Sequence, residues 1–166
     1  MPHEKKDDFS KLVEQHQASV MRICYIYLRD LTLAEDATQE TFLKAYKAMS
    51  RFRGESTKKT WLIQIAINTC KDINRCAWNR KNNRYITPEM LPLAYDPFEK
   101  EDEILLVAIM NLPDKQREAI LLYFYQDLGL KEVSEIIGIS VPAVSKRIQK
   151  GVKMLYSSLK GGNLDE

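Results

Sequence analysis

The hydrophobic residues in the first half of the chain recur with helical spacing. From residue 9 to residue 29 most of them lie three or four positions apart, which is typical of a helix, or a helix pair, with one buried face. Similar patterns run over residues 33–49 and 58–75. Long stretches lack both glycine and proline, which favours helices over a turn-rich β fold. The first half is therefore predicted to be a small helical domain.

The expected helix over residues 33–49 has two different faces. Thr32 is expected to cap its start, with Glu35 completing a capping box. Its inner stripe is formed by Ala34, Ala37, Thr38, Thr41, Phe42, Ala45 and Tyr46. Its outer face carries Asp36, Gln39, Glu40 and Lys44. Residues 51–56 are then predicted to form a loop, and Trp61 in the following helix is assigned to the core.

Proline separates the two halves of the chain. Pro88, Pro92 and Pro97 fall within residues 82–100, and this density breaks helices and indicates a linker. Beyond it, helices are expected over residues 102–111, 114–126, 130–137 and 141–159. The predicted fold is all-α, with two small helical domains over residues 1–80 and 102–162 and a flexible linker over residues 81–101.

Residues 130–148 have the pattern of a helix-turn-helix. A short amphipathic helix ends at Gly138, which can adopt the left-handed conformation of a turn. Ile139 is expected to pack between the helices, Ser140 to cap the next helix, and Pro142 is tolerated in its first turn. With Val144 and Ile148 facing inward, the outward residues are Ser145, Lys146, Gln149 and Lys150, with Arg147 beside them. In a DNA-binding helix-turn-helix, such a face enters the major groove.

Charge supports this interpretation only through its distribution, because the formal net charge is just +2. Residues 141–153 contain four basic residues and no acidic one. A second basic cluster consists of Lys71, Arg75, Arg80, Lys81 and Arg84, against the single acid Asp72. Each cluster alone is as compatible with a solvated helix face as with nucleic-acid binding.

The remaining composition argues against enzymatic chemistry. Cys24, Cys70 and Cys76 show no metal-ligand spacing, and His3 and His16 are the only histidines. Neither a carboxylate cluster with metal-ligand spacing nor a glycine-rich phosphate loop occurs. We therefore expect no cofactor, no metal and no small-molecule substrate. The charged N-terminus and the lack of long apolar stretches predict a cytoplasmic protein.

A helix-turn-helix alone leaves several functions open. It occurs in operator-binding regulators, and a plain helical hairpin or adaptor shares much of the same pattern. A stand-alone regulator would need a ligand pocket, a phosphorylation domain or a dimerisation helix in the first half. No such feature is recognisable in residues 1–80, so the segments of this half must discriminate between these functions.

These segments resemble the extracytoplasmic-function (ECF) group of bacterial RNA polymerase sigma factors. Residues 35–46 (EDATQETFLKAY) are similar to the segment that binds the polymerase. The promoter-opening segment is matched by FRGES at 52–56, TWL at 60–62, IAIN at 65–68 and DINR at 72–75. LPDKQREA at 112–119 resembles the entry to the second DNA-binding domain. The matches occur in family order and span nearly the whole chain.

The resemblance implies roles for individual residues. Core RNA polymerase would dock on Asp36, Gln39, Glu40 and Lys44. The minus-ten promoter element would be opened and bound by Phe52, Arg53, Gly54, Asn68, Lys71 and Arg75, with Arg80, Lys81 and Arg84 on backbone phosphates. The minus-thirty-five element would be read by Ser145, Lys146, Arg147, Gln149 and Lys150. Many relatives carry arginine where this chain has Ser145 and Lys150, so the bases that are read remain open.

The resemblance also implies partners. They are core RNA polymerase, promoter DNA and an anti-sigma factor, which in this family is often membrane-anchored. The expected function is promoter-specific transcription initiation in response to envelope or extracellular stress.

Overall fold

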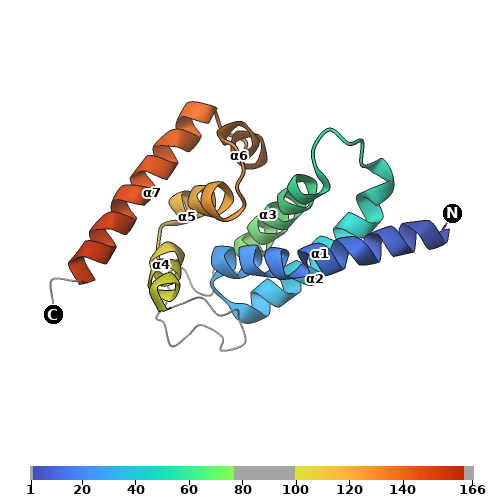
Figure 1. Ribbon diagram of the computed structural model, residues 1–166, viewed down its shortest axis with the longest axis horizontal. Helices are drawn as coiled ribbons and strands as arrows, with labels where there is room; N and C mark the ends of the chain where they lie inside the picture. Colours follow the sequence, from blue (N-terminus) through green and yellow to red (C-terminus); the bar gives the residue numbers. More distant parts are fainter. Residues whose placement is uncertain (1, 77–99, 163–166) are drawn as a thin grey trace. The chain divides into compact units, whose positions relative to one another are not determined.

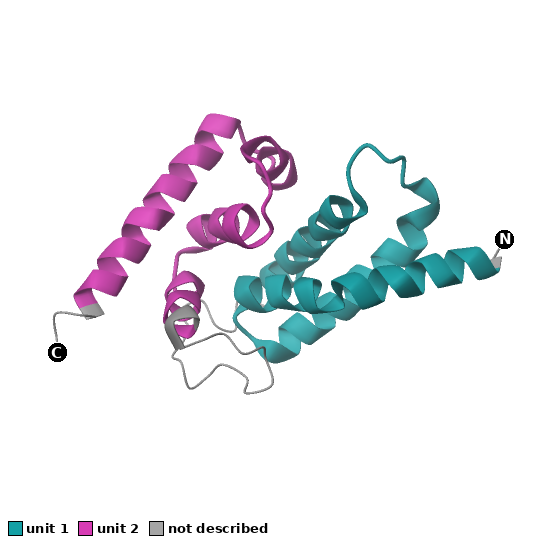
Figure 2. Ribbon diagram, viewed as in Figure 1, with its two compact units in different colours: residues 1–82 teal, residues 83–166 magenta. Residues whose placement is uncertain are grey.

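The computed structural model describes residues 2–76 and 100–162, and these residues fold into helices (Figure 1). They form two compact units, residues 1–82 and 83–166 (Figure 2). No strand occurs among the described residues, and the predicted all-α class is confirmed. Most of the expected linker, and with it Arg80, Lys81 and Arg84, lies outside the described residues.

The first unit packs three helices against one another: α1 (Pro2–Leu28), α2 (Leu31–Ala48) and α3 (Lys58–Cys76). A short 3₁₀ turn, η1 (Met49–Arg51), follows α2. Aliphatic side chains that are almost fully buried form the core, namely Val20, Ile23, Ile26, Leu62, Ile63 and Ile67. Three buried threonines on α2 and α3 donate to the carbonyl four residues earlier, which satisfies their hydroxyl groups inside the core: Thr38, Thr41 and Thr69.

The start of α2 differs from the sequence-based expectation. Asp30 caps this helix, because its carboxylate accepts the backbone N–H of Leu33 at 3.0 Å. Thr32 lies exposed within the first turn, so the predicted Thr32 cap is wrong. The reason is the connection to α1: Arg29 adopts a left-handed conformation (φ 58°), and Asp30 is then extended. The helix therefore begins two residues earlier than expected.

Aromatic side chains pack the N-terminal part of α1 against α2. The ring of Phe9 lies edge-on to Tyr46 at 5.0 Å and to Phe42 at 6.4 Å. The Lys5 ammonium lies 5.2 Å from the centre of the Tyr46 ring. Tyr46 is thus more exposed than the other inner-stripe residues, while its ring still contributes to helix packing.

The second unit consists of α4 (Lys100–Met110), α5 (Asp114–Ile120), the π-helical turn η3 (Leu121–Tyr125), α6 (Leu130–Ile137) and α7 (Val141–Gly162). The helix expected over 114–126 is thus interrupted, since its last part winds as a π-helix. The expected boundaries of α6 are confirmed, and α7 continues beyond its expected end. Helix α7 packs on α5, where Gly151 faces Ile120.

In the described part of the chain, no helix is both long and apolar enough to span a bilayer. The same residues contain no cluster of three or more potential metal-binding side chains.

Candidate nucleic-acid interfaces

Local hydrogen bonds build the turn between α6 and α7. Gly138 has φ 82°, and its N–H donates to the Ser134 carbonyl at 2.8 Å. The Ser134 hydroxyl donates to the carbonyl of Ile139, which ties the turn from the other side. Ser140 Oγ accepts the N–H of Ala143 at 3.3 Å and caps α7. The predicted left-handed glycine and serine cap are both present, so α7 leaves the turn in a defined direction.

The inward and outward faces of α7 are those expected from the sequence. Val144 and Ile148 are buried. The predicted DNA-reading residues lie on the opposite side: Lys146, Gln149 and Lys150 are exposed, and Ser145 and Arg147 are half-buried. Gln149 Nε2 lies 3.5 Å from Ser145 Oγ, so these two polar side chains are in contact on the helix surface. Helix α7 contains five basic residues and no acid along its length.

An aromatic pair connects the loop before α3 with the start of that helix. The rings of Phe52 and Trp61 lie 5.1 Å apart, tilted by 47°. Both residues are half-buried, so the assignment of Trp61 to the core is wrong: its ring lies against that of Phe52 instead. Gly54 has φ 74° and open space around it, and Arg53 beside it is exposed. The nine-residue spacing of the two aromatics conceals this contact in the sequence, because a loop brings them together.

A polar face continues along α3 from this pair. Asn68 lies seven residues beyond Trp61, about 10 Å further along the same side of the helix. Its side chain is exposed, as is that of Gln64 one turn earlier, which the sequence analysis did not single out. Lys71 and Arg75 continue the same face at helical spacing, half-buried and exposed respectively. The structure thus aligns Asn68, Lys71 and Arg75 along one helix surface.

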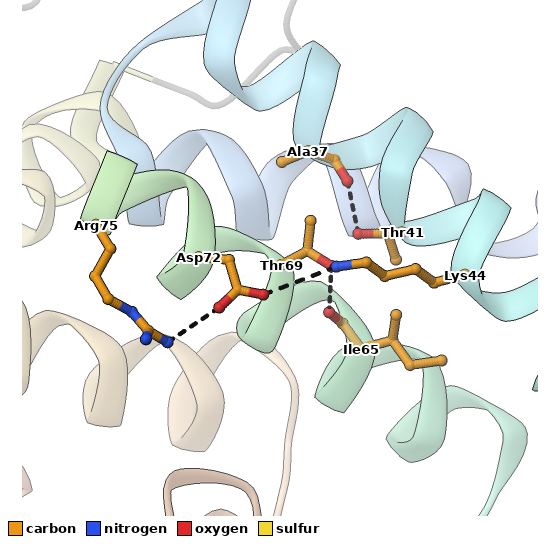
Figure 3. Close-up of polar contacts among 7 residues, drawn as sticks. All are labelled: Ala37, Thr41, Lys44, Ile65, Thr69, Asp72 and Arg75. Atoms are coloured by element: carbon orange, nitrogen blue, oxygen red, sulfur yellow. Dashed lines mark hydrogen bonds and ion pairs between the residues drawn. The ribbon is translucent and has the colours of Figure 1, made fainter. Parts of the chain in front are cut away.

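The outer residues of α2 form a separate surface. Asp36, Gln39 and Glu40 are exposed, and 41% of the Lys44 side chain is accessible. Glu40 and Lys44 also line a groove of about 370 Å³ between α2 and α3. Its remaining walls are Leu33, Thr69, Asp72, Ile73 and Cys76. Lys44 crosses the groove, donating to Thr69 Oγ1 at 3.2 Å and lying 3.9 Å from the Asp72 carboxylate (Figure 3).

The three cysteines differ in their surroundings. Cys24 and Cys70 are fully buried, whereas Cys76 is exposed at the groove. A hydrogen bond with Cys70, aided by one with Thr38, holds the pKa of the Cys24 thiol below its ordinary value although burial opposes this shift. Cys76 is therefore the thiol that a reagent in solution reaches.

Both halves of the chain match models of one protein family. Residues 12–81 match sigma-70 region 2, and residues 102–155 match sigma-70 region 4. The chain is 29% identical to the ECF RNA polymerase sigma factor SigW of Bacillus subtilis, over 93% of this chain and 90% of that protein. It is 27% identical to the RNA polymerase sigma-H factor of Pseudomonas aeruginosa, over 93% and 88%.

Solved structures show the same fold. CnrH, in complex with the cytosolic domain of CnrY, has a TM-score of 0.68 at 22% identity, covering 94% of this chain and 90% of CnrH. The sigma factor RpoE of Bartonella quintana, in complex with the anti-sigma factor NepR, has a TM-score of 0.74 at 21% identity, covering 92% and 97%. Since both sigma-70 regions occur in family order and relatives match along nearly their whole length, the chain belongs to the ECF sigma factors, which direct transcription initiation by RNA polymerase.

Proposed function

We propose that three surfaces of the chain have separate roles in promoter-specific transcription initiation. The outer face of α2 binds core polymerase, the Phe52–Asn68 region opens the minus-ten element, and α7 reads the minus-thirty-five element. The observation that carries this proposal is the capped helix-turn-helix, which directs an acid-free basic helix surface outward. Positive charge without neighbouring acids attracts phosphates, and an exposed helix face fits the major groove.

On α7, the roles follow from side-chain chemistry and exposure. Lys146 and Gln149 are exposed near the start of the helix, the part that contacts base edges in a docked helix-turn-helix. The amide of Gln149 can both donate and accept, so it suits base-edge contacts. Arg147 and Lys150 are assigned to phosphates, and Ser145 orients Gln149 through their shared contact.

In the first unit, the minus-ten surface suits single-stranded DNA. The Phe52–Trp61 pair offers an aromatic platform, and stacking of an unpaired base on such a platform is tolerant of sequence. Arg53 and Gly54 shape the loop beside it, and Asn68 supplies an amide for the edge of an extruded base. Lys71 and Arg75 continue along α3 and would hold the phosphates of the same strand.

The outer face of α2 is assigned to core polymerase. Asp36, Gln39 and Glu40 are exposed in the free chain, and Leu43 next to them on the helix is exposed as well. A surface of this kind gives orientation and specificity through charge and hydrogen bonds. Lys44, whose side chain crosses the groove, belongs to the same face.

An anti-sigma factor is the further partner that we propose. CnrH and RpoE, which share this fold, were each solved in a complex, RpoE with an anti-sigma factor. Both units expose large apolar side chains that a protein partner could cover, including Leu43 in the first unit and Ile104, Phe124 and Tyr156 in the second. We also propose that the chain acts in the cytoplasm, in response to envelope or extracellular stress.

Transcription by core polymerase on a pooled promoter library tests the proposal directly. Addition of the chain is expected to direct transcription from promoters that share an upstream and a downstream element. In a separate binding assay, the chain should co-elute with core polymerase. A stand-alone operator-binding regulator would instead select one DNA sequence without polymerase and leave transcription by the core enzyme unchanged.

Cys76 provides a second test, specific to the docking face. A maleimide should label this exposed thiol rapidly and leave the buried Cys24 and Cys70 unmodified. Because Cys76 shares the groove with Glu40 and Lys44, core polymerase should protect it. A Cys76→Ser variant controls for labelling elsewhere. Unchanged labelling in a complex that still co-elutes would place the polymerase on another surface.

A further inference from the structure

One carboxylate interrupts the basic face of α3. Asp72 is the only acidic residue between Lys58 and Cys76, a segment that contains four basic ones. It lies between Lys71 and Arg75, which we assign to DNA phosphates. An acid at this place repels phosphates, so its presence on a DNA-binding face needs a physical explanation.

The contacts of Asp72 involve both of its oxygens (Figure 3). Oδ1 pairs with Arg75 Nη2 at 3.0 Å, and Oδ2 lies 3.9 Å from Lys44 Nζ. Lys44 is itself held by its hydrogen bond to Thr69, whose hydroxyl donates to the carbonyl of Ile65. The carboxylate is therefore fixed between an arginine of its own helix and an anchored lysine of α2.

In this position the carboxylate imitates a phosphate. A guanidinium that donates to a carboxylate has fewer donors for DNA, and the negative charge beside it repels the strand. Lys44 keeps the carboxylate in place, which a single exposed pair would do only weakly. We propose that Asp72 is a built-in brake on DNA binding: it competes with phosphates for Arg75 and lowers the affinity of the free chain for DNA. This inference rests on the proposed role of Arg75 as a phosphate ligand.

The expected effect of Asp72 on DNA affinity follows from the exposure of the Asp72 and Arg75 side chains. The side chains of Asp72 and Arg75 are 60% and 79% exposed, so solvent screens their interaction. Exposed pairs of this kind correspond to an effect of about two- to fivefold on an equilibrium. Releasing Arg75 should add roughly one phosphate contact, which steepens the salt dependence for single-stranded DNA by about 0.7 in log–log slope.

The test is fluorescence anisotropy of the free full-length chain with a labelled single-stranded oligonucleotide over a series of salt concentrations. Asp72→Asn should bind about two- to fivefold more tightly at low salt, with the steeper slope. Glu14→Gln, an exposed acid of α1, makes the same change in net charge and should leave affinity nearly unchanged. Asp72→Glu keeps the carboxylate and should retain the brake.

Three results would overturn the inference. They are an unchanged affinity of Asp72→Asn, an equal gain in Glu14→Gln, and a gain of the same size when Asp72→Asn is added to Arg75→Gln, where no guanidinium remains to be released. Thermal melts of each variant confirm that the exposed substitutions leave the fold intact. The same preparations are assayed for transcription with core polymerase, so failure of the proposed function and failure of the brake are recorded by different measurements.

Discussion

Substitution of Gly151 by alanine should weaken the second unit, although helix propensity alone predicts the opposite. Glycine within a helix costs roughly 0.5–1 kcal/mol relative to alanine, so helix propensity favours the alanine variant. In the structure, however, a Cβ on Gly151 would lie 2.9 Å from Cγ1 and 3.2 Å from Cδ1 of Ile120, and 3.4 Å from Cβ of Gln116. Ile120 is fully buried and cannot move into solvent.

The packing cost should exceed the gain in propensity. Forcing an extra methyl group into a filled core typically costs about 1–3 kcal/mol. With the middle of each range, subtracting the gain of alanine leaves a net destabilisation of about 1 kcal/mol. Gly161→Ala, in the last turn of the same helix, meets no atom within 4 Å and should be neutral or slightly stabilising. The two identical substitutions therefore separate packing from propensity.

Hydrogen exchange followed by mass spectrometry measures the two units separately within the intact chain. Peptides from α5 and α7 of Gly151→Ala should exchange roughly fivefold faster, whereas peptides from α1–α3 should be unchanged. Ile120→Val removes the Cδ1 methyl and should reduce the penalty in the double variant. Slower exchange in Gly151→Ala, or the same result as Gly161→Ala, would show that α5 and α7 do not pack as described.

Four further predictions concern binding. Glu40→Lys should impair competition for core polymerase without lowering the melting temperature, since it reverses an exposed charge on the docking face. In a promoter library, loss of a base contact in Lys146→Ala or Gln149→Ala should cost about 1–3 kcal/mol at one minus-thirty-five base pair, while loss of a phosphate contact should weaken all promoters alike. Asn68→Ala should reduce permanganate-detected strand opening more than closed-complex formation, because an amide binds an extruded base only after melting; normal opening with normal stability would refute this. The free chain should bind duplex DNA weakly, and nanomolar specific binding at physiological salt would favour a stand-alone regulator.

The features that the sequence predicted well are those set by neighbouring residues. Gly138 and Ser140 determine the turn before α7 through contacts that span only a few positions, and both were identified. The Asp30 cap was missed because it depends on where α1 ends, and the left-handed Arg29 decides this. The π-helical turn at 121–125 has the same apolar composition as a regular helix, so periodicity alone does not distinguish them.

The features that the sequence could not predict join separate elements. Phe52 meets Trp61 only because a loop returns the chain to the start of α3. Asp72 and Lys44 meet because α2 and α3 pack side by side, which leaves no periodic trace in the sequence. The sequence shows which residue types occupy these positions, but only the tertiary structure shows which residues they contact.

A net charge of only +2 gives the chain little overall attraction to DNA. Because α7 alone carries five positive charges and the whole chain has a net charge of +2, the remainder carries a net charge of −3. Attraction to phosphates, which dominates nonspecific affinity, thus depends on local basic surfaces such as those of α7 and α3. On α3, the Asp72 carboxylate would reduce this attraction. A low affinity for bulk DNA would leave the free chain available to the polymerase, and specificity would then arise where both promoter elements are bound in one complex.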